Sequence, residues 1–142
     1  MKSFLVIVCM AVLVGTSSTA FAQQTPTGNK PAVAASSDNA DYTAVEFSKQ
    51  MKEPKAIILD VRTTGEVAQG KIGGSVNIDW NSPTFKEQAS KLDKNAPVYV
   101  YCAVGGRSAS AKKALTQMGF KEVHNLLGGI EAWKKAGLPV VK

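Results

Sequence analysis

The sequence predicts one α/β domain built on an open, parallel β-sheet with helices on both faces. Short apolar runs alternate along the chain with stretches in which apolar residues recur at helical spacing. The runs at 56–61 and 97–101 are almost continuously apolar, the pattern of strands that are covered on both faces in a parallel sheet. This alternation extends over roughly 100 residues, which is enough for one compact domain and not for two.

The domain is expected to begin with a short helix and a buried strand. Thr43 and Glu46 have the spacing of a capping box, which predicts a helix that ends before Pro54. The run 56–61 follows as the first buried strand, apolar up to Asp60.

A helix, a strand and another helix are expected next. Thr63 can cap a short helix that Gly70 would stop. The segment 75–79 is expected to form a short strand after a glycine turn. Ser82 and Pro83 then open a helix, with the serine at the N-cap and the proline in the first turn.

The C-terminal part is expected to hold the central strand and two more helices. The strand 97–101 is followed by a helix over 108–118 and by a last strand at 123–127. A final helix then directs Ile130 and Trp133 inward. Ligands of open parallel sheets gather beyond the carboxyl ends of the strands, so the residues that follow 97–101 are the first candidates for a site.

A thiol stands at this place, where the central strand runs into a loop that contains glycine. A helix N-terminus carries about half a positive charge and unpaired N–H groups, so it lowers the pKa of a thiol from roughly 8.5. Four small residues separate Cys102 from Arg107, and the backbone can therefore curl around the sulfur with its N–H groups pointing inward. Cys102 is the candidate nucleophile; the alternative is a small apolar residue buried at the end of a strand.

The residues around this thiol form the candidate binding loop and its support. Arg107 supplies a permanent cation that can bind an anionic ligand or pair with Asp60. The carboxylates and the arginine that follow the first buried strand are expected to brace the loops rather than to take part in chemistry. The candidate substrate-binding residues are Ala103, Val104, Gly105, Gly106, Arg107 and Ser108, and the candidate support residues are Asp60, Arg62 and Glu66.

Three segments, in this order, resemble the motifs of rhodanese-type sulfurtransferases. They are Leu59-Asp60-Val61-Arg62-Thr63 with Glu66, Gly70, Ile72, Gly74-Ser75 and Asn77-Ile78, the loop Cys102 to Ser108, and Leu127 to Trp133 with Gly137-Leu138-Pro139. The resemblance covers residues 40–140 and implies the rhodanese-like fold. It also implies a thiosulfate sulfurtransferase-type enzyme that moves sulfane sulfur from thiosulfate or a related small anionic donor to cyanide or a thiol, through a persulfide on Cys102.

Other functions remain open for the same residues. Cys102 can instead carry a persulfide to an acceptor protein with little turnover of free small molecules, or act as a redox sensor that forms a sulfenic acid or a mixed disulfide. Phosphatases and arsenate reductases of this fold have a loop one residue longer, because a tetrahedral oxyanion must fit above the thiolate. The shorter loop of this chain argues against them.

The N-terminus has the features of a secretory signal peptide. Lys2 precedes an apolar run at 4–14, and an A-x-A site ends at Ala22. The run is shorter than the roughly 20 residues that cross a bilayer, so a soluble periplasmic protein is expected, not embedded in a membrane. Cleavage removes Cys9 and leaves Cys102 as a single free thiol, which in an exported protein indicates reactivity. The expected organisation is a signal peptide at 1–22, a flexible linker at 23–39 and the folded domain at 40–142.

Composition and motifs argue against several other classes of partner. The formal net charge is +6, but the lysines are dispersed, so no nucleic-acid surface is expected. The glycine pairs do not form a nucleotide-binding motif, and His124 has no partner ligands at metal-site spacing. No cofactor and no metal are therefore expected. Trp133 is expected in the core, and Trp80 near the pocket.

Overall fold

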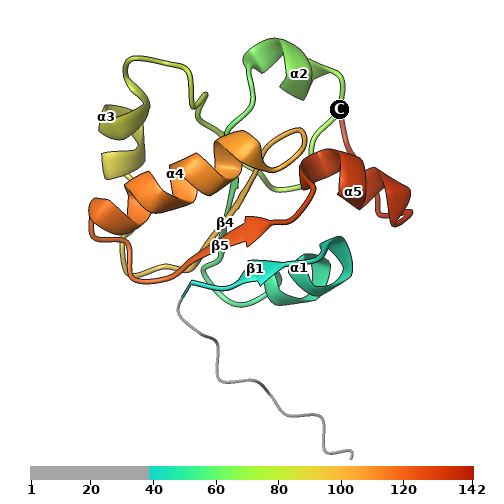
Figure 1. The fold of residues 1–142 in the computed structure, drawn as a ribbon, viewed down its shortest axis with the longest axis horizontal. Coiled ribbons are helices and arrows are strands. Elements are labelled where there is room, and N and C mark those ends of the chain that lie inside the picture. Colours follow the sequence, from blue (N-terminus) through green and yellow to red (C-terminus); the bar gives the residue numbers. More distant parts are fainter. Residues whose placement is uncertain (1–38) are drawn as a thin grey trace, which may run out of the picture. The chain divides into compact units, whose positions relative to one another are not determined.

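The computed structural model describes residues 39–142. The expected signal peptide at 1–22 lies outside the described residues, as does all but the last residue of the expected linker. Five parallel strands form one sheet in the order β1-β5-β4-β2-β3 (Figure 1). They are β1 (Asp41–Tyr42), β2 (Ile57–Asp60), β3 (Val76–Asn77), β4 (Val98–Tyr101) and β5 (Val123–Leu126). The predicted parallel sheet is confirmed.

The central strand β4 separates two apolar clusters because successive side chains of a strand point to opposite faces. Val98 and Val100 belong to one cluster, and Tyr99 and Tyr101 belong to the other. All four residues are buried. This explains the continuously apolar run in the sequence, since neither face of the strand meets water.

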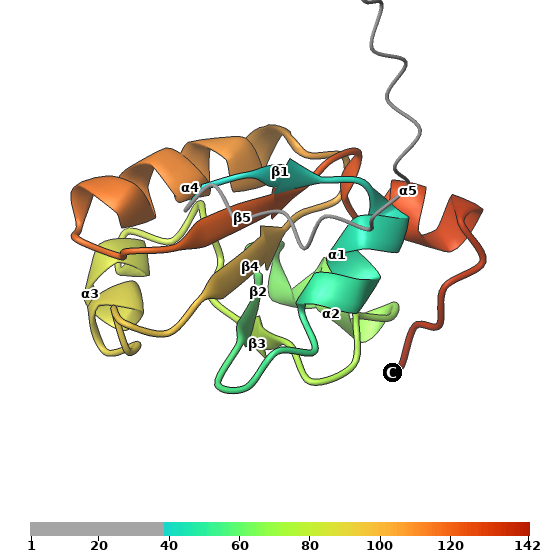
Figure 2. The same cartoon turned by 90° about the horizontal axis from the view of Figure 1, so that it is seen from below.

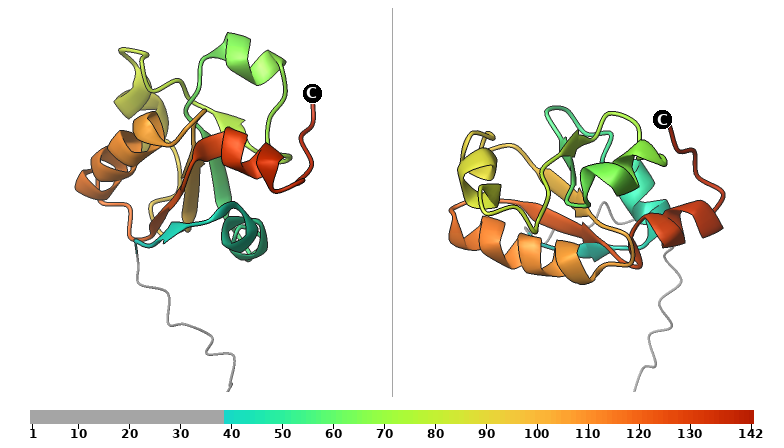
Figure 3. Two further views of the ribbon diagram at one scale, coloured as in Figure 1. Left: turned by 45° about the vertical axis from the view of Figure 1, so that its right-hand side comes forward. Right: turned by 90° about the horizontal axis from the view of Figure 1, so that it is seen from above.

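Helices cover both of these faces. Figures 2 and 3 show α3 and α4 on one side of the sheet and α1 and α5 on the other. α3 and α4 contribute Phe85 and Leu115 to the first cluster, while α1 and α5 contribute Phe47 and Trp133 to the second. The helices are α1 (Ala44–Gln50), α2 (Thr64–Ala68), α3 (Phe85–Ser90), α4 (Gly106–Gln117) and α5 (Gly129–Lys135). Within residues 39–142, none of these helices has the length and apolar character needed to cross a membrane.

The predicted capping box of Thr43 is present, and the predicted N-cap Thr63 forms a second one. Thr43 and Thr63 each accept a hydrogen bond from the N–H of the glutamate three residues on, and that glutamate accepts one from the N–H of the threonine. These bonds satisfy donors that a helix N-terminus would otherwise leave unpaired. The second box fixes α2 directly after β2, at the sheet edge where β4 runs into α4.

The structure differs from the sequence prediction in a few places. Ser82 is not a helix N-cap: α3 begins at Phe85, and the hydroxyl of Ser82 instead accepts the N–H of Thr84 within a turn. Of the strand expected at 75–79, only Val76 and Asn77 form β3, which lies at the edge of the sheet and pairs with β2 alone. The two-residue strand β1 was not predicted, because it is too short to show a period-2 pattern.

Candidate active site

Cys102 lies directly after β4, at the carboxyl edge of the sheet, and the loop 103–105 leads from it into α4. Gly105 has a φ of 106°, and a Cβ at this position would lie 3.3 Å from the backbone nitrogen of Gly128. The turn therefore requires glycine. It brings the N–H of Gly105 back to the sulfur, at an N to Sγ distance of 3.0 Å.

The sulfur of Cys102 is surrounded by hydrogen-bond donors. Besides the N–H of Gly105, the hydroxyl of Ser108 donates to Sγ at 3.4 Å. Burial raises the pKa of the thiol, but hydrogen bonds from the hydroxyl and N–H of Ser108 and from the N–H groups of Gly105 and Val104 outweigh burial, so that the pKa of Cys102 is lowered. The loop thus favours the thiolate, which is the nucleophilic form of cysteine.

Cys102 is also buried, with 1% of the residue exposed, and it contributes to the apolar cluster beneath α4. Val104, two residues further, is 70% exposed, and Gly106 is exposed as well. The sulfur therefore lies just beneath the surface of the loop. A small apolar residue at a strand end would share this burial, but it would not need the N–H groups that point at the sulfur.

The first turn of α5 holds the loop from the opposite side. The N–H of Ile130 donates to the carbonyl of Cys102 at 2.9 Å, and the N–H of Glu131 donates to the carbonyl of Ala103 at 3.1 Å. These carbonyls are thereby turned away from the sulfur. The third sequence motif thus orients the peptide groups whose N–H ends surround the thiolate.

Replacing Gly129 with alanine is expected to displace the loop. Gly129 has a φ of 59°, and its added Cβ would lie 2.4 Å from the carbonyl oxygen of Ala103. We expect a loss of stability of about 1–3 kcal/mol and a higher pKa of Cys102, measured from the pH dependence of thiol alkylation. Gly65→Ala is the control, since nothing lies within 4 Å of its Cβ position. Equal behaviour of the two variants would contradict this role.

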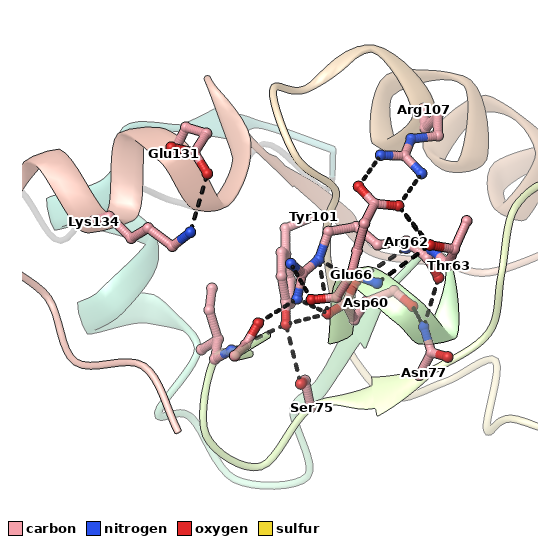
Figure 4. Close-up of polar contacts among 12 residues, drawn as sticks. Asp60, Arg62, Thr63, Glu66, Ser75, Asn77, Tyr101, Arg107, Glu131 and Lys134 are labelled. Carbon is pink, nitrogen blue, oxygen red and sulfur yellow. Dashed lines mark hydrogen bonds and ion pairs between the residues drawn. The ribbon is translucent and has the colours of Figure 1, made fainter. Parts of the chain in front are cut away.

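Arg107 and Glu66 form a bidentate ion pair beside the loop. Nη1 of Arg107 lies 2.8 Å from Oε2 of Glu66, and Nη2 lies 2.7 Å from Oε1 (Figure 4). The pairing of Arg107 with Asp60 that the sequence suggested is wrong, because the Asp60 carboxylate is occupied by Arg62. The guanidinium of Arg107, followed by the N–H and hydroxyl of Thr63, lowers the pKa of Glu66 from 4.5 to about 2, although burial opposes this shift.

The Glu66 carboxylate is expected to make the free energy of unfolding depend on pH in the acidic range. Because its pKa is lower in the folded than in the unfolded chain, its contribution is complete above about pH 4.5 and is lost as the pH falls through about 2. The side chains of Arg107 and Glu66 are 26% and 32% exposed, so solvent limits the size of the effect. Urea unfolding should show Glu66→Gln destabilised at about pH 6 and close to wild type near about pH 2. A difference that does not change with pH would contradict this expectation.

A buried polar network holds the carboxyl end of β2. Nη2 of Arg62 lies 2.6 Å from Oδ2 of Asp60 and donates to the carbonyl of Gly70 at 2.8 Å. The hydroxyl of Tyr101 donates to Oδ2 of Asp60 at 2.7 Å and accepts the N–H of Ile72 at 3.0 Å. Figure 4 shows this network beside the Arg107–Glu66 pair. No hydrogen bond links Asp60 or Arg62 to the sulfur, whereas Glu66 reaches the loop through Arg107.

Three residues of this network have structural roles that the sequence analysis does not assign. Tyr101 is expected only as a residue of the central strand, although its hydroxyl joins β4 to Asp60. Ser75 lies 3.1 Å from that hydroxyl, and the amide of Asn77 donates to the carbonyls of Asp60 and Arg62. Ser75 and Asn77 belong to the first sequence motif, but the motif does not indicate their partners, which are far away in sequence.

The remaining singled-out side chains lie in structural positions. His124 is buried, with Nδ1 at 3.1 Å from the carbonyl of Ala40 and Nε2 at 2.8 Å from the carboxylate of Glu122. Trp133 is in the core as expected, and Trp80 packs edge-on against Phe85. Within residues 39–142, no three His, Cys, Asp or Glu side chains gather as metal ligands would.

Comparisons with known proteins agree with the fold. Residues 43–136 match the rhodanese-like domain family. A sulfurtransferase of Allochromatium vinosum is 38% identical over 96 residues, covering 67% of this chain and 88% of that protein. The thiosulfate sulfurtransferase GlpE of Pseudomonas paraeruginosa is 38% identical over 98 residues, covering 69% of this chain and 87% of that protein.

Solved structures show the same architecture. A rhodanese-related protein from Thermoplasma volcanium superimposes with a TM-score of 0.64 at 33% identity, covering 72% of this chain and 97% of that one. A rhodanese-like domain protein from Staphylococcus aureus gives a TM-score of 0.61 at 32% identity, covering 72% and 99%. The family match spans strands β2 to β5, the Cys102 loop and α5 together, and the chain therefore belongs to the rhodanese-like domain family.

Proposed function

We propose that this protein is a sulfurtransferase in which the thiolate of Cys102 takes sulfane sulfur from thiosulfate or a related donor and passes it to cyanide or a thiol. The observation that carries the proposal is the sulfur of Cys102 with donors directed at it from Gly105 and Ser108, which lower the pKa of the thiol. Relatives named as sulfurtransferases support the same general activity.

In the first half-reaction, the thiolate attacks the outer sulfur of the donor. A bond forms between Sγ and that sulfur, the S–S bond of the donor breaks, and sulfite leaves with the electron pair when the donor is thiosulfate. The terminal sulfur of the persulfide then carries the negative charge. The N–H groups of the loop 103–108 are the donors that stabilise it.

In the second half-reaction, cyanide or a thiolate attacks the terminal sulfur of the persulfide. Thiocyanate or a new persulfide leaves, and the thiolate of Cys102 is restored. No electron acceptor is needed, because sulfane sulfur moves between nucleophiles without net oxidation of the enzyme. Since Cys102 is 1% exposed, the loop must move aside to admit each substrate.

Steady-state kinetics with thiosulfate and cyanide tests this function. A persulfide intermediate predicts parallel lines in double-reciprocal plots, because the donor product leaves before the acceptor binds. Intersecting lines would contradict transfer through an enzyme persulfide. The absence of turnover would reject the catalytic function for these substrates.

A persulfide carrier is the second candidate, and the burial of Cys102 favours it. A shielded persulfide exchanges slowly with free small molecules. It would persist on Cys102 until an acceptor protein binds and opens the loop. Under this function, the protein takes up one sulfur atom and then stops, although cyanide is in excess. Multiple turnovers would reject the carrier and support the enzyme.

We also propose that the protein is exported to the periplasm with residues 23–39 as a flexible linker. The support is the signal-peptide pattern of residues 1–22, in which a basic residue, an apolar run and an A-x-A site follow one another. The intact mass of the protein from a periplasmic extract should correspond to a chain that begins at Gln23. A full-length chain in the cytoplasm would contradict export.

A further inference from the structure

The loop around Cys102 offers little free positive charge to bind a dianion. No charged residue separates Cys102 from Arg107 in the loop. The guanidinium of Arg107 is engaged through both Nη atoms by the carboxylate of Glu66. A paired cation offers little net attraction to a second anion, because the field of its partner opposes it.

Two more negative groups act on the same guanidinium. The hydrogen bonds that Arg107 donates to the Glu66 carboxylate raise the pKa of Arg107 against the effect of burial, and the charges of Glu66, Cys102 and Asp79 raise it further. The guanidinium of Arg107 is thus bound by the carboxylate of Glu66 and also experiences the negative charges of Asp79 and of the Cys102 thiolate. Each additional negative charge on a donor adds repulsion in proportion to that charge.

Arg62, the other arginine near the site, does not supply the missing positive charge. Arg62 is 4% exposed, and its guanidinium is bound by the Asp60 carboxylate and by the carbonyls of Gly70 and Glu66. Withdrawing it from these partners would leave the buried Asp60 carboxylate unpaired, which is costly. Arg62 thus stays within the network and does not reach a ligand at the loop.

Two apolar side chains, Val104 and Leu127, are exposed near the loop, and we call these two residues the rim of the site. Val104 is 70% exposed and Leu127 is 46% exposed. Their segments meet where the added Cβ of Gly105 would lie 3.3 Å from the backbone nitrogen of Gly128. Exposed Val104 of the loop and exposed Leu127 thus each precede a glycine at this contact, and a carbon group of a ligand that binds there can shield them from water.

From this charge balance and this rim, we infer that the donor site favours sulfane donors that carry one negative charge and an apolar group over the dianion thiosulfate. The inference rests on the proposed function and names the class of its donor. An aromatic thiosulfonate, R–SO₂–S⁻, is the simplest probe of this class. Its outer sulfur bonds to Sγ of Cys102, its S–S bond breaks, and the sulfinate R–SO₂⁻ leaves with the electron pair.

The dependence of kcat/KM on ionic strength tests the inference without any substitution. Salt screens repulsion, so kcat/KM should rise with added potassium chloride, and more steeply for thiosulfate than for the thiosulfonate. A kcat/KM for thiosulfate that falls with salt would overturn the inference, because it reports net attraction. If neither donor transfers sulfur at any ionic strength, the proposed function itself fails.

A single substitution tests the charge balance directly. Glu66→Gln removes one negative charge, and glutamine can still complete the capping box with Thr63. We expect kcat/KM for thiosulfate to rise roughly threefold or more, about the square of the rise for the thiosulfonate, because the dianion carries twice the charge. Glu46→Gln is a matched control, since Glu46 closes the capping box of α1 with Thr43 and has no Arg107 partner. Equal changes for both donors would overturn the inference.

The substitution Leu127→Ser tests whether an apolar group of the donor binds at the rim of the site. Leu127→Ser should raise KM for the aromatic thiosulfonate by about threefold to tenfold while leaving KM for thiosulfate close to that of wild type. The backbone N–H of Leu127 still donates to the carbonyl of Tyr42 in this variant. An unchanged KM for the thiosulfonate, or an equal rise for both donors, would remove Leu127 from the donor site.

Discussion

Replacing Cys102 with serine is expected to abolish sulfur transfer. A serine hydroxyl is not ionised near neutral pH and cannot form a persulfide, so the rate should fall by at least about three orders of magnitude. The substitution keeps the shape of the side chain, and the N–H of Gly105 and the hydroxyl of Ser108 can bond to oxygen as they do to sulfur.

The fold of this variant should be retained. We expect its free energy of unfolding to lie within about 1–2 kcal/mol of wild type, since the hydrogen bonds around the side chain can be kept. Circular dichroism and urea unfolding provide the control for folding. A folded Cys102→Ser protein that still transfers sulfur would show that another group is the nucleophile.

Replacing Asp60 with alanine is expected to have the largest effect on stability. Asp60 is fully buried, and its carboxylate accepts hydrogen bonds from Arg62 and from the hydroxyl of Tyr101. Removing it leaves the guanidinium of Arg62 buried and unpaired, which costs about 3–5 kcal/mol. This loss is a large part of the roughly 5–15 kcal/mol that stabilises a domain of this size.

Urea unfolding measures this loss, and the chain offers a control. Glu87→Ala breaks the exposed ion pair with Lys91, in which both side chains are 70% exposed, and should change stability by less than about 1 kcal/mol. The double variant Asp60→Leu with Arg62→Met should recover part of the loss, because it removes both charges together. Similar losses for Asp60→Ala and Glu87→Ala would contradict the buried network.

The sequence predicts well those features that depend on residues close to one another in the chain. The capping boxes of Thr43 and Thr63 need only a glutamate three residues away, so they can be identified without any knowledge of the fold. The four apolar residues of β4 likewise indicate a strand buried on both faces. The position of Cys102 after this strand followed from the same pattern.

The features that escaped prediction depend on which distant side chains meet. The sequence offered Asp60 as the partner of Arg107, yet Arg62, two residues from Asp60, already occupies that carboxylate. Glu66 is left to pair with Arg107. The burial of Cys102 and the need for glycine at 129 also required the structure. The first follows from the packing of Cys102 in the apolar cluster beneath α4, and the second from the contact between the loop and α5.

The intact mass of the protein after exposure to a sulfane donor shows whether Cys102 carries the transferred sulfur. We expect the protein to gain one sulfur atom, peptide mapping to place it on Cys102, and cyanide then to remove it. The Cys102→Ser protein should gain nothing under the same conditions. Sulfur transfer through Cys102 would be refuted if the protein gained no sulfur from either thiosulfate or a thiosulfonate, or gained it at another residue.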